Sequence, residues 1–212
     1  MKLLELFCGT KSITKEFKDW DTFTVDFNPV FEPDLCGDIL DMTSEQIIKL
    51  FGRPDVIWAS PPCTTFSVAS LGHHWTGGKG AYIPKTEECQ KGIDVLNKTI
   101  QLIQELNPKY FFIENPRDVM RKMPVMQQFN RYTITYCQYG DSRMKPTDIW
   151  TNHPNPEFKP PCHNGDTCHV AAPRGSRTGT QGLKNAMERA RIPSEFCKHI
   201  YEICNKEGEV NR

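Results

Sequence analysis

Residues 2–10 read Lys-Leu-Leu-Glu-Leu-Phe-Cys-Gly-Thr, and this stretch decides the fold class. Its apolar first half is typical of a buried strand, and the glycine at position 9 predicts a turn directly after that strand. Residues 12–17 follow with apolar side chains at helical spacing and are predicted to be helical. A strand, a turn and a helix in this order form the unit from which parallel α/β sheets are built.

The same alternation continues along the chain. Predicted strands cover residues 22–26, 56–59, 110–113 and 131–138, and residues 148–151 are expected to pair with the last of them as a hairpin. Predicted helices cover residues 43–51, with Ser44 as N-cap, 87–106 and 193–205. Residues 68–85 contain four glycines without periodicity and are predicted to be a mobile loop. This order predicts an α/β fold with a doubly wound, mostly parallel sheet.

The composition is that of one folded domain in a reducing compartment. The chain has 212 residues, of which 38% are hydrophobic and 25% charged, and most of its nine cysteines are scattered through apolar segments. An odd number of scattered cysteines favours free thiols over a disulfide framework. No apolar stretch reaches the roughly 18 residues of a membrane span, and the N-terminal sequence lacks the pattern of a signal peptide. We therefore expect a cytoplasmic protein that does not insert into membranes.

A net charge of zero conceals an uneven distribution of charge. Residues 1–62 carry six basic and eleven acidic side chains, whereas residues 143–191 carry eight basic and four acidic ones. The acidic N-terminal part excludes a protein that coats nucleic acid uniformly, but the basic segment is compatible with one phosphate-facing patch. An unevenly charged, solvated surface explains the charges alone equally well.

Polar or reactive side chains stand at the ends of four predicted strands. These are Cys8, Asp26, Cys63 and Glu114. Because the carboxyl ends of parallel strands meet at one edge of a sheet, we expect them to form one site. An acid after the second strand suits hydrogen bonds to ribose hydroxyls, so Asp26 indicates a cofactor that contains a nucleoside. The single early glycine lacks the full phosphate-binding fingerprint and disfavours a dinucleotide.

The turn that carries Cys63 is stiffened by two preceding prolines, Pro61 and Pro62. A thiol held at a strand end is a candidate nucleophile, although an isolated cysteine is more often an inert core residue. Glu114 ends an apolar strand, where burial favours the protonated carboxyl that acts as a general acid. A thiol and a carboxylic acid together suit nucleophilic addition to an unsaturated ring.

Four motifs in order resemble those of the cytosine-5 DNA methyltransferase family. LELFCG at residues 4–9 resembles its first motif, SPPCTTFS at 60–67 its Pro-Cys nucleophile motif, and FIENP at 112–116 its Glu-Asn motif. Residues 139–147 (YGDSRMKPT) resemble its Gln-x-Arg-x-Arg motif, and residues 191–204 weakly resemble its closing helix. The chain is particularly similar to the short members that bacteriophages encode. The resemblance implies a Rossmann-like methyltransferase that uses S-adenosylmethionine.

The resemblance also implies roles for individual residues. Cys63 would attack carbon 6 of cytosine, Glu114 would contact ring nitrogen 3 and the exocyclic amine, Asn115 would position the Pro-Cys loop and Arg143 would bind the target base. A base inside a duplex is out of reach of a thiolate, so the target must be flipped out or unpaired. The cofactor is expected to contact Phe7, Cys8, Gly9, Thr10, Asp26 through its ribose, Phe27 through one face of its adenine, Asp38, Ile39 and Pro62.

Two departures from the family pattern bear on the substrate. Arg143, Lys145 and Thr147 stand where the family has Gln, Arg and Arg, and Lys145 is expected to bind a phosphate. Full-length members also insert a large target-recognition domain, whereas 62 residues follow Trp150 here. The expected substrate is therefore single-stranded or weakly selected DNA, or DNA recognised with a partner protein. RNA, a free cytosine nucleotide, a modified donor and a catalytically silent binding protein of the same fold remain alternatives.

The C-terminal part contains two further candidate sites. Cys162, Cys168 and His169 have a plausible arrangement for a structural zinc ion, with His163, His153 or Cys137 as the fourth ligand. The alternative is a polar loop with two buried thiols. Arg174 and Arg177, in a glycine-rich stretch, are expected to contact nucleic-acid phosphates, unless this stretch is a disordered loop. The predicted organisation is a catalytic core over 1–152, a loop-rich segment over 153–190 and a C-terminal helical segment over 191–212 that packs on the core.

Overall fold

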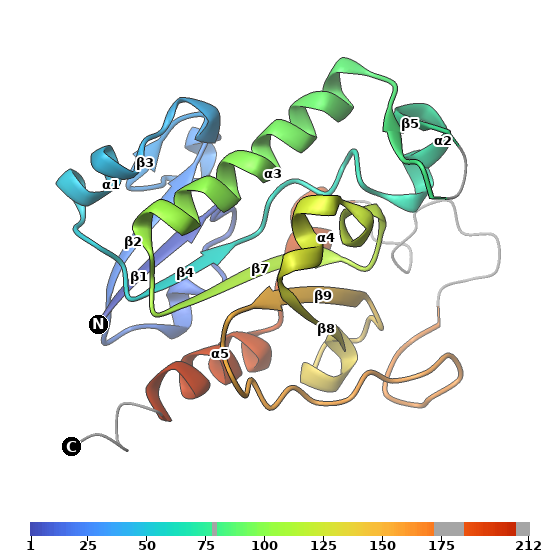
Figure 1. Ribbon diagram of the computed structural model, residues 1–212. Helices are drawn as coiled ribbons and strands as arrows, with labels where there is room; N and C mark the ends of the chain where they lie inside the picture. The colour runs from blue at the N-terminus through green and yellow to red at the C-terminus, as the bar shows by residue number, and fades with distance from the viewer. Residues whose placement is uncertain (78–79, 172–184, 207–212) are drawn as a thin grey trace.

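The protein is built around a seven-stranded sheet, described from a computed structural model of residues 1–77, 80–171 and 185–206. Figure 1 shows the sheet between two layers of helices. Its strands are β1 (Lys2–Leu6), β2 (Asp21–Asp26), β3 (Leu35–Cys36), β4 (Val56–Ala59), β7 (Tyr110–Pro116), β8 (Asn130–Thr135) and β9 (Pro146–Thr151). A two-stranded ribbon of β5 (Trp75–Thr76) and β6 (Ile83–Pro84) is separate from it.

The strand order is β3-β2-β1-β4-β7-β9-β8. The first five strands of this order are mutually parallel, and β9 runs antiparallel to both β7 and β8. After β1 the chain adds β2 and β3 on one side, and then returns to place β4 on the other side. The order therefore reverses between β1 and β4, and such a switch point opens a ligand crevice at the carboxyl ends of the strands. The sheet confirms the predicted α/β fold and the predicted hairpin.

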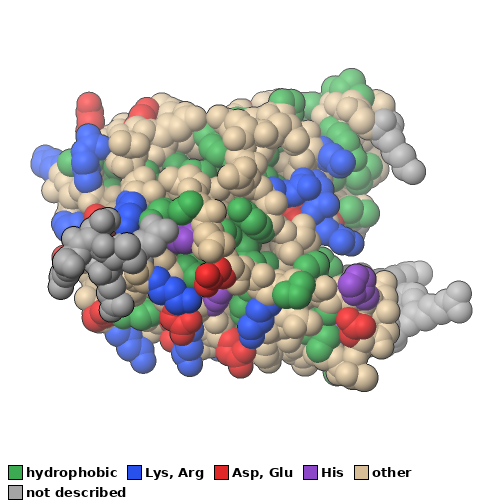
Figure 2. All heavy atoms as spheres, turned by 60° about the horizontal axis from the view of Figure 1, so that its bottom comes forward, with side chains coloured by type: hydrophobic (Ala, Val, Ile, Leu, Met, Phe, Trp, Pro, Cys, Tyr) green, Lys and Arg blue, Asp and Glu red, His purple; other side chains and the backbone are tan. Residues whose placement is uncertain are grey.

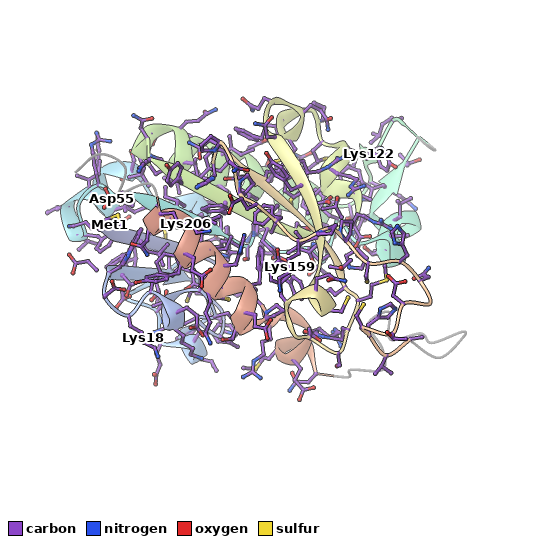
Figure 3. The ribbon with its side chains drawn as sticks, turned by 90° about the horizontal axis from the view of Figure 1, so that it is seen from below. Met1, Lys18, Asp55, Lys122, Lys159 and Lys206 are labelled. Carbon is purple, nitrogen blue, oxygen red and sulfur yellow. The ribbon has the colours of Figure 1, made fainter. Side chains whose placement is uncertain are left out.

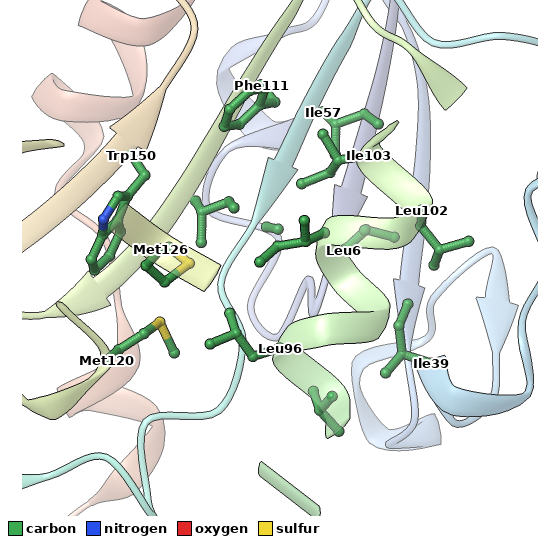
Figure 4. Close-up of a cluster of buried hydrophobic side chains, with 14 of the residues drawn as sticks. Leu6, Ile39, Ile57, Leu96, Leu102, Ile103, Phe111, Met120, Met126 and Trp150 are labelled. Carbon is green, nitrogen blue, oxygen red and sulfur yellow. The ribbon is translucent and has the colours of Figure 1, made fainter. Parts of the chain in front are cut away.

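Helices cover both faces of the sheet (Figure 1). On one face α1 (Ser44–Leu50) and α3 (Glu87–Leu106) enclose a cluster that includes the side chains labelled in Figure 4. On the other face α5 (Ser194–Lys206) buries Phe196 and Ile200 against a second cluster that includes Trp58. The remaining helices are α2 (Leu71–His74), α4 (Ala186–Ala190) and the 3-10 helices η1 (Thr14–Glu16), η2 (Pro29–Phe31), η3 (Ile39–Asp41), η4 (Val68–Ser70), η5 (Val119–Lys122), η6 (Pro124–Gln128) and η7 (Tyr136–Tyr139). No helix in the described ranges is long and apolar enough to cross a bilayer.

Several predicted elements differ in detail from the structure. The helix expected over 12–17 is only the short η1, and the helix α1 is capped by Thr43, whose Oγ1 accepts a hydrogen bond from Gln46 N–H at 3.1 Å, rather than by Ser44. The loop expected over 68–85 contains η4, α2 and the β5–β6 ribbon. Trp75 begins this ribbon, buried against Phe66, and its indole N–H donates to the Thr65 carbonyl at 2.7 Å. The aromatic ring thus anchors the segment that follows Cys63.

The last two predicted strands also have different ends. β7 continues through Glu114 to Pro116, because residues 114–116 still pair with residues 147–149 of β9. β8 ends at Thr135 and is followed directly by the 3-10 helix η7. Gly140, the C-cap of η7, has a left-handed conformation (φ +83°). Glu114 therefore lies within a strand that is paired on one side, which restricts its backbone more than the predicted turn would.

Glu5 is a buried carboxyl in the middle of the sheet, only 2% exposed. It accepts hydrogen bonds from the backbone N–H of Ile13 at 3.4 Å and of Thr14 at 3.0 Å, so it fixes the segment after the first turn. Burial raises its pKa to about 7 in spite of these bonds. Since the unfolded carboxyl titrates near 4.5, the folded state holds the extra proton between these pH values, and its stability falls as the pH rises through them.

We predict that Glu5→Gln flattens this pH dependence. Relative to the variant, the wild type should lose about 3 kcal/mol of unfolding free energy between pH 4.5 and 7.5. Urea denaturation at several pH values measures the difference. A constant difference between the two proteins across this range would show that Glu5 does not titrate there.

Candidate active site

A cavity of about 280 Å³ opens at the carboxyl edge of the sheet, beside the β1–β4 switch point. Its lining includes six of the nine residues predicted to bind the cofactor: Phe7, Asp26, Phe27, Asp38, Ile39 and Pro62. Sequence reasoning missed the rest of the lining, which comprises Val25, Gly37, Thr64, Thr65, Glu88, Lys91, Gly92 and Val95. The cavity is mostly apolar, with a few carboxylates at its edge, which is typical of a site for a nucleoside-containing ligand.

Phe27 and Asp38 offer two different kinds of contact at this cavity. The Phe27 ring is 67% exposed, which is unusual for an aromatic side chain beside a cavity and leaves a face free for stacking. One Asp38 oxygen accepts a hydrogen bond from Leu40 N–H at 3.1 Å, and the other pairs with Lys91 Nζ at 3.0 Å. These contacts lower the pKa of Asp38, with the backbone bond as the larger cause. The carboxylate is therefore charged and faces solvent at the cavity edge.

Asp26 ties together the ends of β1 and β2. Its two carboxylate oxygens accept hydrogen bonds from Gly9 N–H and from Asn28 N–H, both at 2.9 Å. Gly9 has a φ of +45°, a conformation that glycine adopts without strain. Each carboxylate oxygen has a second lone pair, so both oxygens can still accept a bond from a ligand. Asp26 is thus a rigid acceptor beside the cavity.

Three predicted cofactor residues in the first turn do not line this cavity. Cys8 is buried, and burial raises its pKa to about 12, which keeps the thiol protonated. Gly9 contributes through its backbone N–H, as described above. Thr10 lines a second, more open cavity with Ser12, whose Oγ lies 3.0 Å from Thr10 Oγ1. A direct role for these three residues stays a prediction.

Gly92 lets helix α3 close the cavity. A Cβ at this position would collide with Thr65 Oγ1, so a larger residue would force Thr65 or the helix to move. A glycine inside an amphipathic helix is the one signal in the sequence that could have indicated this close approach. Its neighbour Lys91 gave no such signal.

Cys63 follows β4, and Glu114 lies near the end of the neighbouring parallel strand β7. Ala59 of β4 pairs with Ile113 of β7, so the turn after β4 and the end of β7 lie at the same edge of the sheet. Asn115 joins them directly, because its side-chain amide donates to the Pro61 carbonyl at 2.8 Å. The Asn115 Oδ1 atom is buried and has no hydrogen-bond partner among the described residues. The two motifs that carry Cys63 and Glu114 are therefore close together in the structure.

The charges around Cys63 have opposite effects on its thiol. Burial and the carboxylate of Glu114 raise the pKa of Cys63, while the ammonium of Lys145 lowers it. The net result is a thiol that holds its proton more tightly than a free cysteine does. Lys145 thus interacts electrostatically with both Cys63 and Glu114. Burial lowers the pKa of its own ammonium.

Tyr136 contacts both Glu114 and Lys145, and sequence reasoning missed it. Its hydroxyl donates to Glu114 Oε1 at 2.9 Å, and its ring lies 4.5 Å from Lys145 Nζ. Burial and the Glu114 carboxylate raise the pKa of Tyr136 well above its ordinary value, so the hydroxyl keeps its proton. Tyr136 lies in an aromatic-rich stretch that reads as an ordinary strand, and no spacing distinguishes it from a core residue.

Arg143 is buried and fully engaged in contacts within the protein. Its guanidinium binds both carboxylate oxygens of Asp141, and its remaining N–H groups donate to the backbone carbonyls of Glu188, Arg189 and Arg191. These contacts use all five of its donors. Arg143 therefore fastens the end of α4 to the loop after η7, and its predicted contact with the base would require this network to open. Lys145, expected at a phosphate, instead donates to the Arg189 carbonyl at 2.9 Å and faces Tyr136.

The predicted metal ligands Cys162, Cys168 and His169 lie together with Cys137. The other two candidates for the fourth ligand are elsewhere: His153 is buried in the core, with Nε2 3.3 Å from the Ile203 carbonyl, and His163 is not part of the cluster. Arg174 and Arg177 lie outside the described residues.

Comparison with known proteins identifies the family of this chain. Residues 1–132 match the family model of C-5 cytosine-specific DNA methylases. A protein of Frog virus 3 (isolate Goorha), named "Probable DNA (cytosine-5)-methyltransferase", is 30% identical over 224 residues, which cover 96% of this chain and all of the viral one. This relative is viral, and the predicted bacteriophage origin stays a prediction.

Solved methyltransferase structures also resemble the chain. The Dnmt2 methyltransferase of S. pombe is 12% identical, with a TM-score of 0.48 over 71% of this chain and 48% of that one. The Entamoeba histolytica methyltransferase EhMeth is 13% identical, with a TM-score of 0.47 over 71% of this chain and 52% of that one. The chain thus spans about half the length of these two structures. On the strength of the family model and the viral relative, this chain belongs to the family of C-5 cytosine-specific DNA methylases.

Proposed function

We propose that the protein transfers a methyl group from S-adenosylmethionine to carbon 5 of cytosine in DNA, with Cys63 as nucleophile and Glu114 as general acid. One observation carries the proposal. Asn115 ties the turn of Cys63 to the end of the strand that holds Glu114, so a thiol and a carboxyl group share one electrostatic environment beside a nucleoside-sized cavity. Family membership supplies the reaction that this pair fits.

The cavity fits S-adenosylmethionine. The exposed face of Phe27 suits stacking on adenine, the lone pairs of Asp26 suit ribose hydroxyls, and the free face of the Asp38 carboxylate suits the adenine amine. Ile39 and Val95 supply apolar contacts at the cavity wall. When bound, the cofactor supplies an electrophilic methyl group on a sulfonium.

The residues of the chain would activate and release the cytosine ring. Cys63 Sγ, as the thiolate, forms a bond to carbon 6, and the electron pair of the 5–6 double bond moves to carbon 5. As the general acid, Glu114 donates a hydrogen bond from its protonated carboxyl to ring nitrogen 3 and stabilises the negative charge that develops in the ring. After carbon 5 has gained its methyl group, solvent water takes the proton of carbon 5, the electron pair of that C–H bond re-forms the 5–6 double bond, and Cys63 Sγ leaves carbon 6 with the bonding electrons. Lys145 stabilises the thiolate at both stages, because its ammonium lowers the pKa of Cys63.

Two residues would position these groups rather than react. Asn115 holds the Pro61 carbonyl and so fixes the turn of Cys63. Tyr136 donates to one oxygen of Glu114 and leaves the other free for the base. Because its hydroxyl is the donor in this bond, Tyr136 constrains the side-chain rotation of Glu114 before the base arrives.

We propose DNA as the substrate because the chain belongs to this family. The chemistry decides whether the target base is paired. Cys63 needs access to the face of the ring, so the base has to be unpaired or flipped out. Figure 2 shows basic and acidic side chains interspersed over the face that it draws. Over the described residues this face offers no concentrated positive charge for phosphates, and we propose a partner protein or Arg174 and Arg177 as additional sources of DNA contacts.

A methyl-transfer assay tests the proposal and separates the alternatives. Purified protein is incubated with tritiated S-adenosylmethionine and, separately, duplex DNA, single-stranded DNA, RNA and dCMP. Label in DNA that is recovered as 5-methylcytosine supports the proposal, and label only in RNA or dCMP moves the activity to those substrates. Cofactor binding without label in any substrate points to a missing partner or another donor. Absence of cofactor binding would contradict the enzyme assignment and favour a silent binding protein.

We predict that Phe27→Ala weakens cofactor binding about tenfold, because it removes a stacking surface worth roughly 1–3 kcal/mol. The melting temperature should not change, since the ring is already 67% exposed. Calorimetric titration with S-adenosylmethionine measures the dissociation constant. Val30→Ala is the matched control, because Val30 lies in the adjacent η2 and is 73% exposed but does not line the cavity. Equal dissociation constants for both variants would exclude the adenine contact.

A further inference from the structure

Three cysteines and one histidine converge on one point outside the cofactor cavity. Cys137 belongs to η7, and Cys162, Cys168 and His169 follow β9. Cys137 Sγ lies 3.0 Å from Cys162 Sγ and 3.6 Å from Cys168 Sγ. His169 Nδ1 lies 3.6 Å from the Sγ atoms of both Cys162 and Cys168. All four atoms lie within 4.8 Å of one another.

Three of the separations in this cluster, at 3.6 Å, match those of a tetrahedral metal site, and the 3.0 Å between Cys137 Sγ and Cys162 Sγ is shorter. Zinc binds thiolate sulfur at about 2.3 Å and imidazole nitrogen at about 2.0 Å, which places neighbouring ligand atoms roughly 3.3–3.8 Å apart. Thiolate and imidazole ligands suit zinc and disfavour magnesium and calcium, which prefer oxygen. We infer that Cys137, Cys162, Cys168 and His169 bind one structural zinc ion, in a closed site with four protein ligands.

The backbone around the ligands is held in place by other contacts. Cys162 N–H donates to Thr135 Oγ1 at 3.0 Å, at the end of β8. Between the two loop cysteines, His163 N–H donates to Asp166 Oδ2 at 2.7 Å, and Asp166 N–H donates to the His163 carbonyl at 3.2 Å. Gly165 has a φ of +98°, which allows the chain to reverse here. The turn brings both sides of the loop back to η7.

Neither a disulfide nor apolar packing accounts for the whole cluster. A disulfide joins two sulfurs and gives no reason for a third sulfur and an imidazole nitrogen at the same point. Apolar packing would bury all the thiols, but Cys168 is exposed. A metal ion is the one occupant that uses all four groups.

The zinc site would also hold a residue of the proposed active site in place. This consequence rests on the proposed function. Cys137 directly follows Tyr136, whose hydroxyl holds Glu114 at 2.9 Å. The segment leading to the cluster is fastened to the same turn by Lys159, labelled in Figure 3: its N–H bonds the Tyr139 hydroxyl and its Nζ the Gln138 carbonyl, both at 2.9 Å. The ion would thus fix η7 at the residue next to Tyr136 and keep Tyr136 in place.

Metal content of the purified full chain tests the site. We expect about one zinc ion per chain by mass spectrometry of the metal. Protein reloaded with cobalt should show charge-transfer absorption from thiolate to cobalt. Metal-free protein that takes up neither ion, or a chain whose intact mass under non-reducing conditions reveals a disulfide among these cysteines, would overturn the inference.

Variants of the two cluster residues that are not buried, Cys168 and His169, keep this test independent of folding. Cys168→Ser and His169→Ala should each lower the zinc content at least fivefold. Cys36→Ser and His163→Ala are the matched controls, because Cys36 is an exposed free cysteine and His163 lies beside a ligand, and neither belongs to the cluster. Full zinc content in both cluster variants, with well-folded protein, would overturn the ligand assignment.

The link to the active site has a separate readout. Chelation of the zinc should lower kcat about tenfold, as is typical of groups that orient a reacting residue, while cofactor affinity stays within twofold. Unchanged kcat in metal-free protein would overturn the link to Tyr136 and leave the metal site standing. Zinc bound to a protein without any methyl transfer would contradict the proposed function alone.

Discussion

Cys63→Ala should abolish methyl transfer, with a loss of at least about 1,000-fold, because the variant lacks the thiol that is proposed to form the bond to carbon 6. Cofactor binding should persist, since the cavity is lined by Pro62 and Thr64 on either side of the thiol and not by Cys63 itself. The loss is measured as tritium transfer to DNA, with calorimetry for the cofactor.

The control for this variant is Cys36→Ala, which removes an exposed thiol at the end of β3. It should retain wild-type activity. A trapping experiment adds a second readout: DNA that contains 5-fluorocytosine should form a denaturation-resistant complex with the wild type and none with Cys63→Ala. Methyl transfer by a folded Cys63→Ala protein would refute the covalent mechanism.

Glu114→Gln should lower kcat about 100- to 10,000-fold, the range expected for the loss of a general acid. The substitution preserves the size of the side chain and an oxygen that accepts the hydrogen bond from Tyr136. The fold should therefore be retained, and the effect should be on the chemical step. Single-turnover kinetics with saturating DNA and cofactor measure it.

The same substitution should make Cys63 more reactive towards a simple electrophile. The carboxylate of Glu114 raises the pKa of Cys63, so its removal increases the thiolate fraction at a given pH. Alkylation of Cys63 by iodoacetamide at pH 8, followed by mass spectrometry of the peptide, should therefore be faster in Glu114→Gln than in the wild type. A merely structural role of Glu114 would not produce faster alkylation together with slower methyl transfer. Slower or equal alkylation would contradict the proposed charge interaction.

The buried carboxylate of an ion pair lies on the strand next to the one that holds Glu114. Asp148 of β9 pairs with Asn115 of β7 in the sheet register, and its carboxylate is bound by Arg121 at 2.8 Å and by Thr133 Oγ1 at 2.8 Å. Asp148 is fully buried, so the partners are needed to offset its desolvation. This network fixes the strand next to Glu114 and was not suggested by any motif.

Sequence patterns predicted the parts of this protein that depend on local properties. The apolar runs of β1, β4 and β7, and the helical period of α3, each follow from the side chains of one continuous segment, so periodicity suffices to find them. The placement of Cys63 and Glu114 at neighbouring strand ends follows from the rule that parallel strands share a carboxyl edge. The local signals failed where tertiary contacts decide: residues 12–17 keep only η1, which ends at Phe17 (φ −93°, ψ +48°), where the ring packs against Trp20 and Tyr201.

The tertiary structure alone decided which side chains complete each site. Tyr136 reaches Glu114, Gly92 admits Thr65, and Cys137 joins three ligands that stand 25 to 32 positions later in the chain. Arg143, which its motif suggested for the base, is engaged by Asp141 and three carbonyls of the C-terminal part. The physical reason is the same in each case. A hydrogen bond, a close approach or a metal site depends on distances between segments far apart in sequence, and those distances are set only when the sheet and its two helical layers pack together.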